Sequence, residues 1–128
     1  MELRWDEAGI AAIIARCDAA GRQVTVAVKV DAVLGCPVDS GELRRSIRDE
    51  YPEPNVGRVY VGTDHWAPTE YGSRPHVIRA RKPGGVLRFF WEREDRWFFG
   101  PKVNHPGTPA QPFMRPAIWR RRTIPGLP

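Results

Sequence analysis

The fold is decided by residues 5–34, which read WDEAGIAAIIARCDAAGRQVTVAVKVDAVL. Apolar residues recur in steps of three and four along this stretch, so they fall on one side of a helix. The stripe consists of Ile10, Ile13, Ile14, Cys17, Ala20, Val24, Ala27 and Val28. It predicts one long helix over residues 5–34, with its apolar side packed against the rest of the chain.

The second half of this stretch has an alternative interpretation. Val24, Val26, Val28 and Val30 alternate with other residues, and β-branched side chains favour strands. Gly21 could end a first helix and allow a strand to begin. The stripe continues on both sides of Gly21, which favours a helix, but the conformation of residues 22–34 stays open at this point.

A short second helix is predicted after the break at residues 35–38. Asp39 and Ser40 are good N-caps, and Glu42 stands three residues after Asp39, as in a capping box. Leu43 and Ile47 give this helix one apolar edge. Prolines soon after Ile47 limit its continuation.

The rest of the chain reads as short strands, turns and a last helix. We expect strands at residues 58–63, 76–78, 86–91 and 97–99, the last two as an antiparallel pair. Residues 66–72 read as a loop or single helical turn, and 82–85 as a turn. Proline makes regular structure unexpected in the first half of 104–119, whereas residues 113–122 predict a C-terminal helix. The expected fold is α+β, a single domain over residues 1–128 with a long N-terminal helix packed on an antiparallel sheet.

Composition narrows the classes of function. The net charge of +5 and the pI near 9.8 suggest an acidic partner, either nucleic acid or an acidic protein face. The charge reads as spread along the chain, with its densest point at Arg120, Arg121 and Arg122. No stretch is long and apolar enough to cross a bilayer, and no signal peptide is evident, so we expect cytoplasmic synthesis and no membrane partner. Cys17 and Cys36 read as two reduced thiols.

A catalytic or metal site has no support in the sequence. His65, His76 and His105 are scattered, and the adjacent pair Asp64 and His65 would rarely point the same way. Ser40 is explained by helix capping. No phosphate-binding glycine loop and no zinc spacing occurs. We therefore expect no enzyme, no catalytic residue, no metal and no cofactor.

One basic stretch is interleaved with aromatic residues, which suits nucleic-acid binding. Its members are Arg74, His76, Arg79, Arg81, Lys82 and Arg88, among Trp66, Tyr71, Phe89 and Trp91. The competing interpretation, which we favour, places Phe89 and Trp91 in the core and the arginines on an outward face or a protein interface.

Three blocks of the sequence resemble a known family. Residues 38–47, VDSGELRRSI, resemble the "P-V-D-T-G-x-L-R-x-S-I" signature of small tailed-phage neck proteins, the HK97 gp10-like family of head-to-tail connector and minor capsid proteins. Residues 67–73, APTEYGS, are similar to its "Y-A-x-x-V-E-F-G-T" stretch. Residues 105–118, HPGTPAQPFMRPAI, are similar to its "H-P-G-T…Q-P-F-L-R-P-A-L" ending. The departures are Trp66-Ala67-Pro68 in place of Tyr-Ala, and serine for threonine at Ser40 and Ser73.

The resemblance implies a structural subunit of the phage neck, forming a ring that joins the capsid portal to the tail. Its expected partners are copies of itself, other connector proteins, portal-proximal and tail-terminator proteins, and packaged DNA bound without sequence preference. Its expected location is the virion neck, after synthesis in the cytoplasm of a bacterial host. The alternative from another class is a small basic nucleic-acid-binding protein that acts alone.

Two sets of residues are candidates for these contacts. A ring requires one patch to meet a different patch on the next copy. We expect one patch in residues 66–74 with the sheet edge, at Trp66, Glu70, Tyr71 and Arg74. The segment PFMRPAI and its helix, with Phe113, Met114, Arg115 and Trp119, would supply the other patch or anchor the first, although Phe113, Met114 and Ile118 could equally be core residues. A secondary hypothesis is a DNA-facing lumen, which would use Arg44, Arg45, Arg48, Arg120, Arg121 and Arg122. The same residues could equally meet an acidic neighbouring ring.

Overall fold

The N-terminal helix is the longest element of the molecule. The computed structural model describes residues 4–121, apart from the side chain of Arg93. Helix α1 (Glu7–Gly35) has 29 residues, and Asp6 caps it by accepting a hydrogen bond from the Gly9 backbone N–H at 3.0 Å. Residues 22–34 are therefore helical, which resolves the open alternative. Val28 and Ala32 are buried on one side of α1, and this packing outweighs the strand preference of the valines.

The second helix is shorter than predicted. Helix α2 (Glu42–Arg45) is a single turn with Gly41 as its N-cap, at a φ of 78°. The predicted capping box at Asp39 is wrong, because the N-cap residue is Gly41, which has no side chain to accept a hydrogen bond. The Ser40 hydroxyl accepts from the Glu42 N–H, at the start of α2, at 3.3 Å. The Ser46 hydroxyl donates to the Leu43 carbonyl at 2.7 Å as the helix ends, and Ile47 already belongs to a strand.

The first antiparallel pair follows at once. Strand β1 (Ile47–Glu53) pairs with β2 (Val56–Val61), Ile47 standing opposite Val61. The strand predicted at residues 58–63 is β2, displaced by two residues toward the C-terminus. No strand was predicted at β1, because its charged and proline residues are not typical of a strand. Helix α1 packs against both strands.

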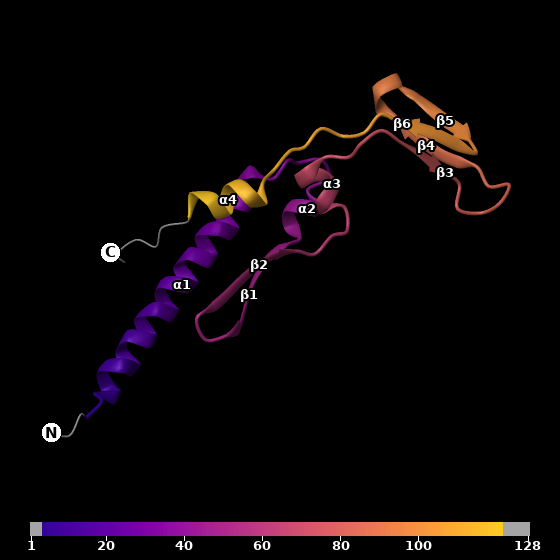
Figure 1. Ribbon diagram of the computed structural model, residues 1–128. Coiled ribbons are helices and arrows are strands. Elements are labelled where there is room, and N and C mark those ends of the chain that lie inside the picture. Colours follow the sequence, from indigo (N-terminus) through magenta and orange to yellow (C-terminus); the bar gives the residue numbers. More distant parts are fainter. Residues whose placement is uncertain (1–3, 122–128) are drawn as a thin grey trace.

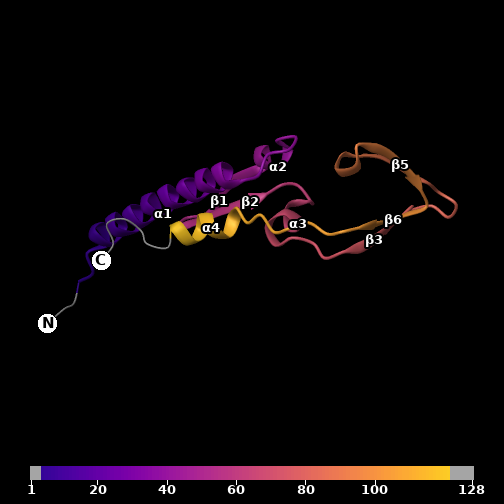
Figure 2. The same ribbon diagram turned by 90° about the horizontal axis from the view of Figure 1, so that it is seen from above.

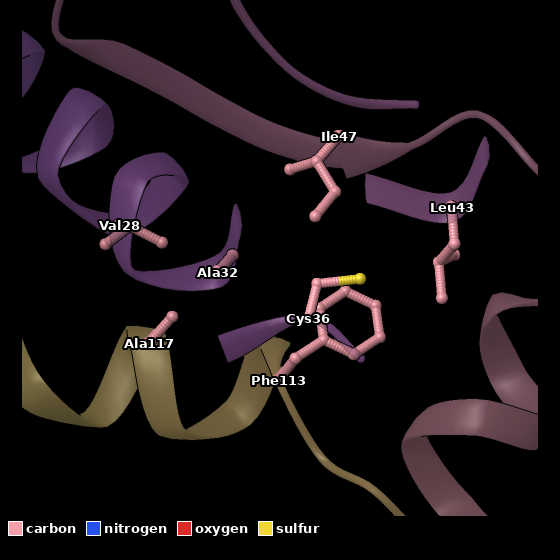
Figure 3. Packing of buried hydrophobic residues seen from close by; sticks show 7 residues of the cluster. All are labelled: Val28, Ala32, Cys36, Leu43, Ile47, Phe113 and Ala117. Atoms are coloured by element: carbon pink, nitrogen blue, oxygen red, sulfur yellow. The ribbon is translucent and has the colours of Figure 1, made fainter. Parts of the chain in front are cut away.

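The buried core lies where α1, α2, β1 and the last helix meet. Helix α3 (Trp66–Tyr71) was expected as a loop or a single helical turn, and helix α4 (Met114–Arg120) as a C-terminal helix. Figure 3 shows the side chains of the core pointing into the space between α1, α2, β1 and α4. Its members are Val28, Ala32, Cys36, Leu43, Ile47, Phe113 and Ala117.

The remaining strands form an arm that extends away from α1 in both views (Figures 1 and 2). Strand β3 (His76–Arg79) pairs antiparallel with β6 (Lys102–His105). Strand β4 (Leu87–Trp91) pairs antiparallel with β5 (Arg96–Gly100), and the short helix η1 (Glu92–Glu94) connects the two strands. The antiparallel pair β4–β5 was predicted, whereas β6 occupies residues 104 and 105 that were expected to be irregular.

We call residues 74–107 the arm, and the described residues on either side of them the body. At the base of the arm, Ser73 and Thr108 exchange two backbone hydrogen bonds of 2.9 and 3.0 Å. Gly107 has a φ of 88°, and a Cβ on it would lie 2.3 Å from the Ser73 carbonyl oxygen. The two segments that enter the arm can approach each other this closely because residue 107 is glycine.

The fold class is α+β, as predicted, with a long N-terminal helix, short helices and antiparallel pairing. The expected single sheet is instead three separate two-stranded pairs, β1–β2, β3–β6 and β4–β5.

Candidate interaction surfaces

Strand β2 and helices α3 and α4 enclose a shallow, mainly apolar groove of about 360 Å³. We call it the α3–α4 groove. It is lined by Val59, Tyr60, Val61, Trp66, Glu70, Tyr71, Met114, Arg115 and Ile118. The groove joins two segments that are more than 40 residues apart in the sequence and that the resemblance had singled out separately.

Glu70 holds these two segments together from inside. Its side chain is only 1% exposed, and its carboxylate accepts the backbone N–H groups of Phe113, Met114 and Arg115 at 2.7, 3.0 and 3.1 Å. The Arg115 Nε donates to the same carboxylate at 3.0 Å, and its Nη2 donates to the Glu70 carbonyl at 3.2 Å. Glu70 therefore satisfies N–H groups that the first turn of α4 would leave without partners.

The charge of Glu70 is maintained by these donors. Burial by itself raises the pKa of the carboxyl, but the N–H groups of Met114, Phe113 and Arg115, with the Arg115 guanidinium, outweigh burial and leave the pKa below its usual value. Glu70 is thus a buried carboxylate with a structural role.

The exposed part of the groove is aromatic. The Arg115 guanidinium lies over the Tyr71 ring at 4.8 Å, and the Trp66 and Tyr71 rings are 6.2 Å apart. Tyr71 and Ile118 are both more than half exposed. Such a surface resembles the centre of a protein interface, where aromatic residues, methionine and arginine are enriched.

The predicted interface residues divide into three groups. Trp66, Tyr71, Met114 and Arg115 come together in the groove, and Trp119 is exposed on α4. Arg74 lies apart from them at the base of the arm. The third group is buried: Glu70, and Phe113, which is 1% exposed and belongs to the core. These two side chains act inside the subunit, and their interface assignment is corrected accordingly.

The predicted lumen residues do not form one surface in the described chain. Arg44 donates to the Cys36 carbonyl at 2.9 Å, and its Nε is buried. Arg121 makes a two-point ion pair with Asp31, at 2.9 and 3.2 Å, that fastens the end of α4 to α1. Arg45, Arg48 and Arg120 are exposed, but Arg120 is at the end of α4 that lies away from α2 (Figure 1). Arg122 lies outside the described residues.

The apolar stripe of α1 is only half covered. Its C-terminal part packs on the core, but Ile10, Ile13 and Ile14 are exposed, Ile13 by 61%. Cys17, next on the stripe, is also exposed as a free thiol. The sequence predicted the stripe correctly, but the other elements of the body cover it only in the second half of α1.

The arm is aromatic on both of its faces. On one face of β4–β5, the Phe89 and Phe98 rings stack at 5.3 Å, with Trp91 next to both. On the other face, Phe90 and Trp97 pair at 5.8 Å, and Trp97 and Phe99 are 55% and 60% exposed. The sequence placed Phe89 and Trp91 in a core; they are partly buried within the arm instead.

The positive charge of the chain is concentrated on the arm, and not spread evenly as its sequence had suggested. Residues 74–107 contain eight basic and three acidic residues, a net charge of +5. The other 94 residues contain twelve of each sign. The three acidic residues of the arm, Glu92, Glu94 and Asp95, all lie at the far turn beyond β4.

Comparison of the chain with family models, with curated proteins and with solved structures found no match. None of the helices within residues 4–121 is both long and apolar enough to span a membrane. The same residues bring no three His, Cys, Asp or Glu side chains together as ligands for a metal ion.

Proposed function

We propose that this protein is a non-catalytic structural subunit that assembles with copies of itself into a ring, as in the neck between a phage capsid portal and tail. The sequence resemblance suggests the neck, and one observation supports ring assembly. The body of a single chain leaves two different apolar surfaces open, the α3–α4 groove and the N-terminal half of the α1 stripe. Exposed apolar surfaces of this kind are typical of protein interfaces.

Two unlike surfaces are what a ring requires. In a heterologous contact, one patch of a subunit meets a different patch of the next, and the contact closes into a ring if the rotation allows it. The groove is concave and rimmed by aromatic residues, whereas the α1 stripe is convex and aliphatic. We propose that they meet between neighbouring copies, with portal-proximal and tail-terminator proteins above and below.

The test is native mass spectrometry of the full chain, alone and after mixing with tailless capsids that carry a portal. We expect rings in at least one of these conditions. Ile118→Glu, which places a carboxylate in the groove, should weaken assembly by about tenfold or more, because that charge would be buried in the interface. Val56→Glu is the matched control, since Val56 is also exposed but is the first residue of β2, next to the turn from β1 and outside the groove.

Two results would refute the proposal. The chain could stay monomeric under both conditions, or the Ile118 and Val56 variants could assemble equally well. A monomer that binds bare DNA in a salt-sensitive manner would instead support the alternative, a nucleic-acid-binding protein acting alone.

A further inference from the structure

The junction of the two strand pairs of the arm is where its positive charge is densest. Arg79 and Lys102 stand directly opposite each other in the β3–β6 pair. Arg81 and Lys82 follow in the turn that leads to β4, and all four side chains are exposed. We call these four residues the arm cluster.

The arm cluster has no internal charge balance. Like charges placed directly opposite each other on paired strands destabilise the pairing. Within the described residues, no salt bridge joins any member of the cluster to an acidic side chain, whereas five of the six salt bridges in the structure lie in the body. The arrangement weakens the folded arm by itself, and it would be relieved by an anion bound from outside.

The neighbouring β4–β5 pair supplies a surface of a different chemistry. Arg88 is exposed on β4, with its guanidinium 5.3 Å from the Trp97 ring and 5.7 Å from the Phe99 ring. Phe90 completes this exposed aromatic face. Flat aromatic and guanidinium surfaces stack on nucleic-acid bases, whatever the base, because every base has a π-face.

From these two features, we propose that the arm binds nucleic acid without reading its sequence. The arm cluster neutralises backbone phosphates, and the face of Phe90, Trp97 and Phe99 stacks on unpaired bases. An acidic protein surface would also satisfy the charges, but a guanidinium lying against two exposed rings beside the arm cluster offers the combination of phosphate neutralisation and base stacking that single-stranded nucleic acid uses. The inference concerns only the arm, and it does not depend on ring assembly.

The proposed site differs from the DNA-facing residues that the sequence suggested. Arg121 is paired with Asp31, and Arg44 donates to the Cys36 carbonyl from a half-buried position, so neither is a free exposed cation. The arm cluster is exposed and projects from the body, so a nucleic acid could reach it from several directions (Figure 1).

The experiment measures fluorescence anisotropy of labelled oligonucleotides of about 20 nucleotides, single-stranded and duplex, with the full chain in about 50 to 200 mM salt. The first variant carries Arg79→Gln, Arg81→Gln, Lys82→Gln and Lys102→Gln. Its control carries Arg4→Gln, Arg16→Gln, Arg22→Gln and Arg58→Gln, four exposed body residues that were not candidates for DNA contact, an equal loss of charge. We expect tight, salt-dependent binding for wild type and control. The arm variant should bind at least about tenfold more weakly. The slope of its log affinity against log salt concentration should be smaller, corresponding to about 2 to 3 fewer phosphate contacts.

The aromatic contribution is tested by Trp97→Leu, which keeps an apolar side chain on the arm. We expect it to weaken single-strand binding by about five- to tenfold and duplex binding much less, since duplex bases are already stacked. Circular dichroism of each variant checks that the arm has kept its strands.

Three results would overturn the inference. Wild type could fail to bind either oligonucleotide at low salt, or the arm and control variants could lose affinity equally, which would mean that overall charge alone attracts the nucleic acid. If the chain bound polyglutamate as tightly as the oligonucleotides, and Trp97→Leu did not change oligonucleotide binding, the arm would be assigned to an acidic protein partner.

Discussion

Glu70 shows how one residue can connect two distant segments of a small protein. Its carboxylate receives three backbone N–H groups and one guanidinium N–H, all from residues 113–115. Those donors would otherwise be desolvated next to Phe113 without partners. The loss of a single acceptor should therefore affect both α3 and α4.

We predict that Glu70→Gln lowers the free energy of unfolding by about 3 kcal/mol, because an amide presents its NH₂ to donors that need an acceptor. Urea denaturation monitored by tryptophan fluorescence measures this. The control is Glu50→Gln, which removes a half-exposed ion pair with Arg58 and should change stability by less than about 1 kcal/mol. Similar losses for both variants would contradict the structural role of Glu70.

The pH dependence follows from the same contacts. The pKa of Glu70 is lower in the folded chain than that of an ordinary glutamate, so its contribution to stability is complete above the ordinary pKa and is lost as the pH falls through the folded pKa. The stability difference between wild type and Glu70→Gln should therefore be largest near neutral pH and shrink at acid pH. Asp31 and Asp49, whose pKa values are lowered by hydrogen bonds from Arg121 and Lys29, are common to both proteins and cancel in the comparison. A difference that stays constant with pH would show that Glu70 is not acting as a carboxylate.

At the scale of elements, the packing of β2 on α1 depends on the absence of a side chain. A Cβ at Gly57 would lie 1.9 Å from the Thr25 hydroxyl oxygen of α1, whereas a Cβ at Gly21 would meet nothing within 4 Å. The same substitution should therefore have opposite effects at these two glycines.

We predict that Gly57→Ala destabilises the protein by about 1 to 3 kcal/mol, because β2 must move away from α1. Gly21→Ala should stabilise it by about 0.5 to 1 kcal/mol, because alanine loses less backbone entropy in a helix. Thermal denaturation of both variants under the same conditions measures the two effects. Equal shifts in the same direction would mean that β2 does not pack on Thr25.

The elements also show what the sequence can and cannot predict. Periodicity found α1, and motif residues such as Phe113 and Met114 were correctly expected near the start of α4. Strand β1 was missed because Arg48, Asp49 and Glu50 follow no apolar alternation; their side chains are stabilised instead by pairs such as Lys29 with Asp49 at 2.6 Å. These contacts come from distant elements, which local sequence patterns do not contain.

The candidate surfaces were predictable only in part, for a similar reason. The motif blocks pointed to Trp66, Tyr71, Met114 and Arg115, which do line one groove. Nothing local distinguishes Glu70 from its exposed neighbours, since its burial depends on the N–H groups of α4. The arm cluster was divided across the sequence, because Lys102 comes opposite Arg79 only through the β3–β6 register.

At the scale of the whole molecule, the chain separates two kinds of surface. The body has no net charge and leaves apolar surfaces open at the α3–α4 groove and the α1 stripe, while the arm carries the net positive charge and exposed aromatic rings. This separation suits a subunit that meets protein through its body and nucleic acid through its arm. In a ring, each copy would contribute one arm to a surface shared by all.

The most direct test of the proposed ring is cryo-electron microscopy of the neck of intact tailed-phage particles assembled in bacteria that carry the gene for this chain. We predict a ring of this protein between portal and tail, with the α3–α4 groove of each copy covered by the α1 stripe of its neighbour. Absence of the protein from the neck, or a ring in which both surfaces stay exposed to solvent, would contradict the proposal.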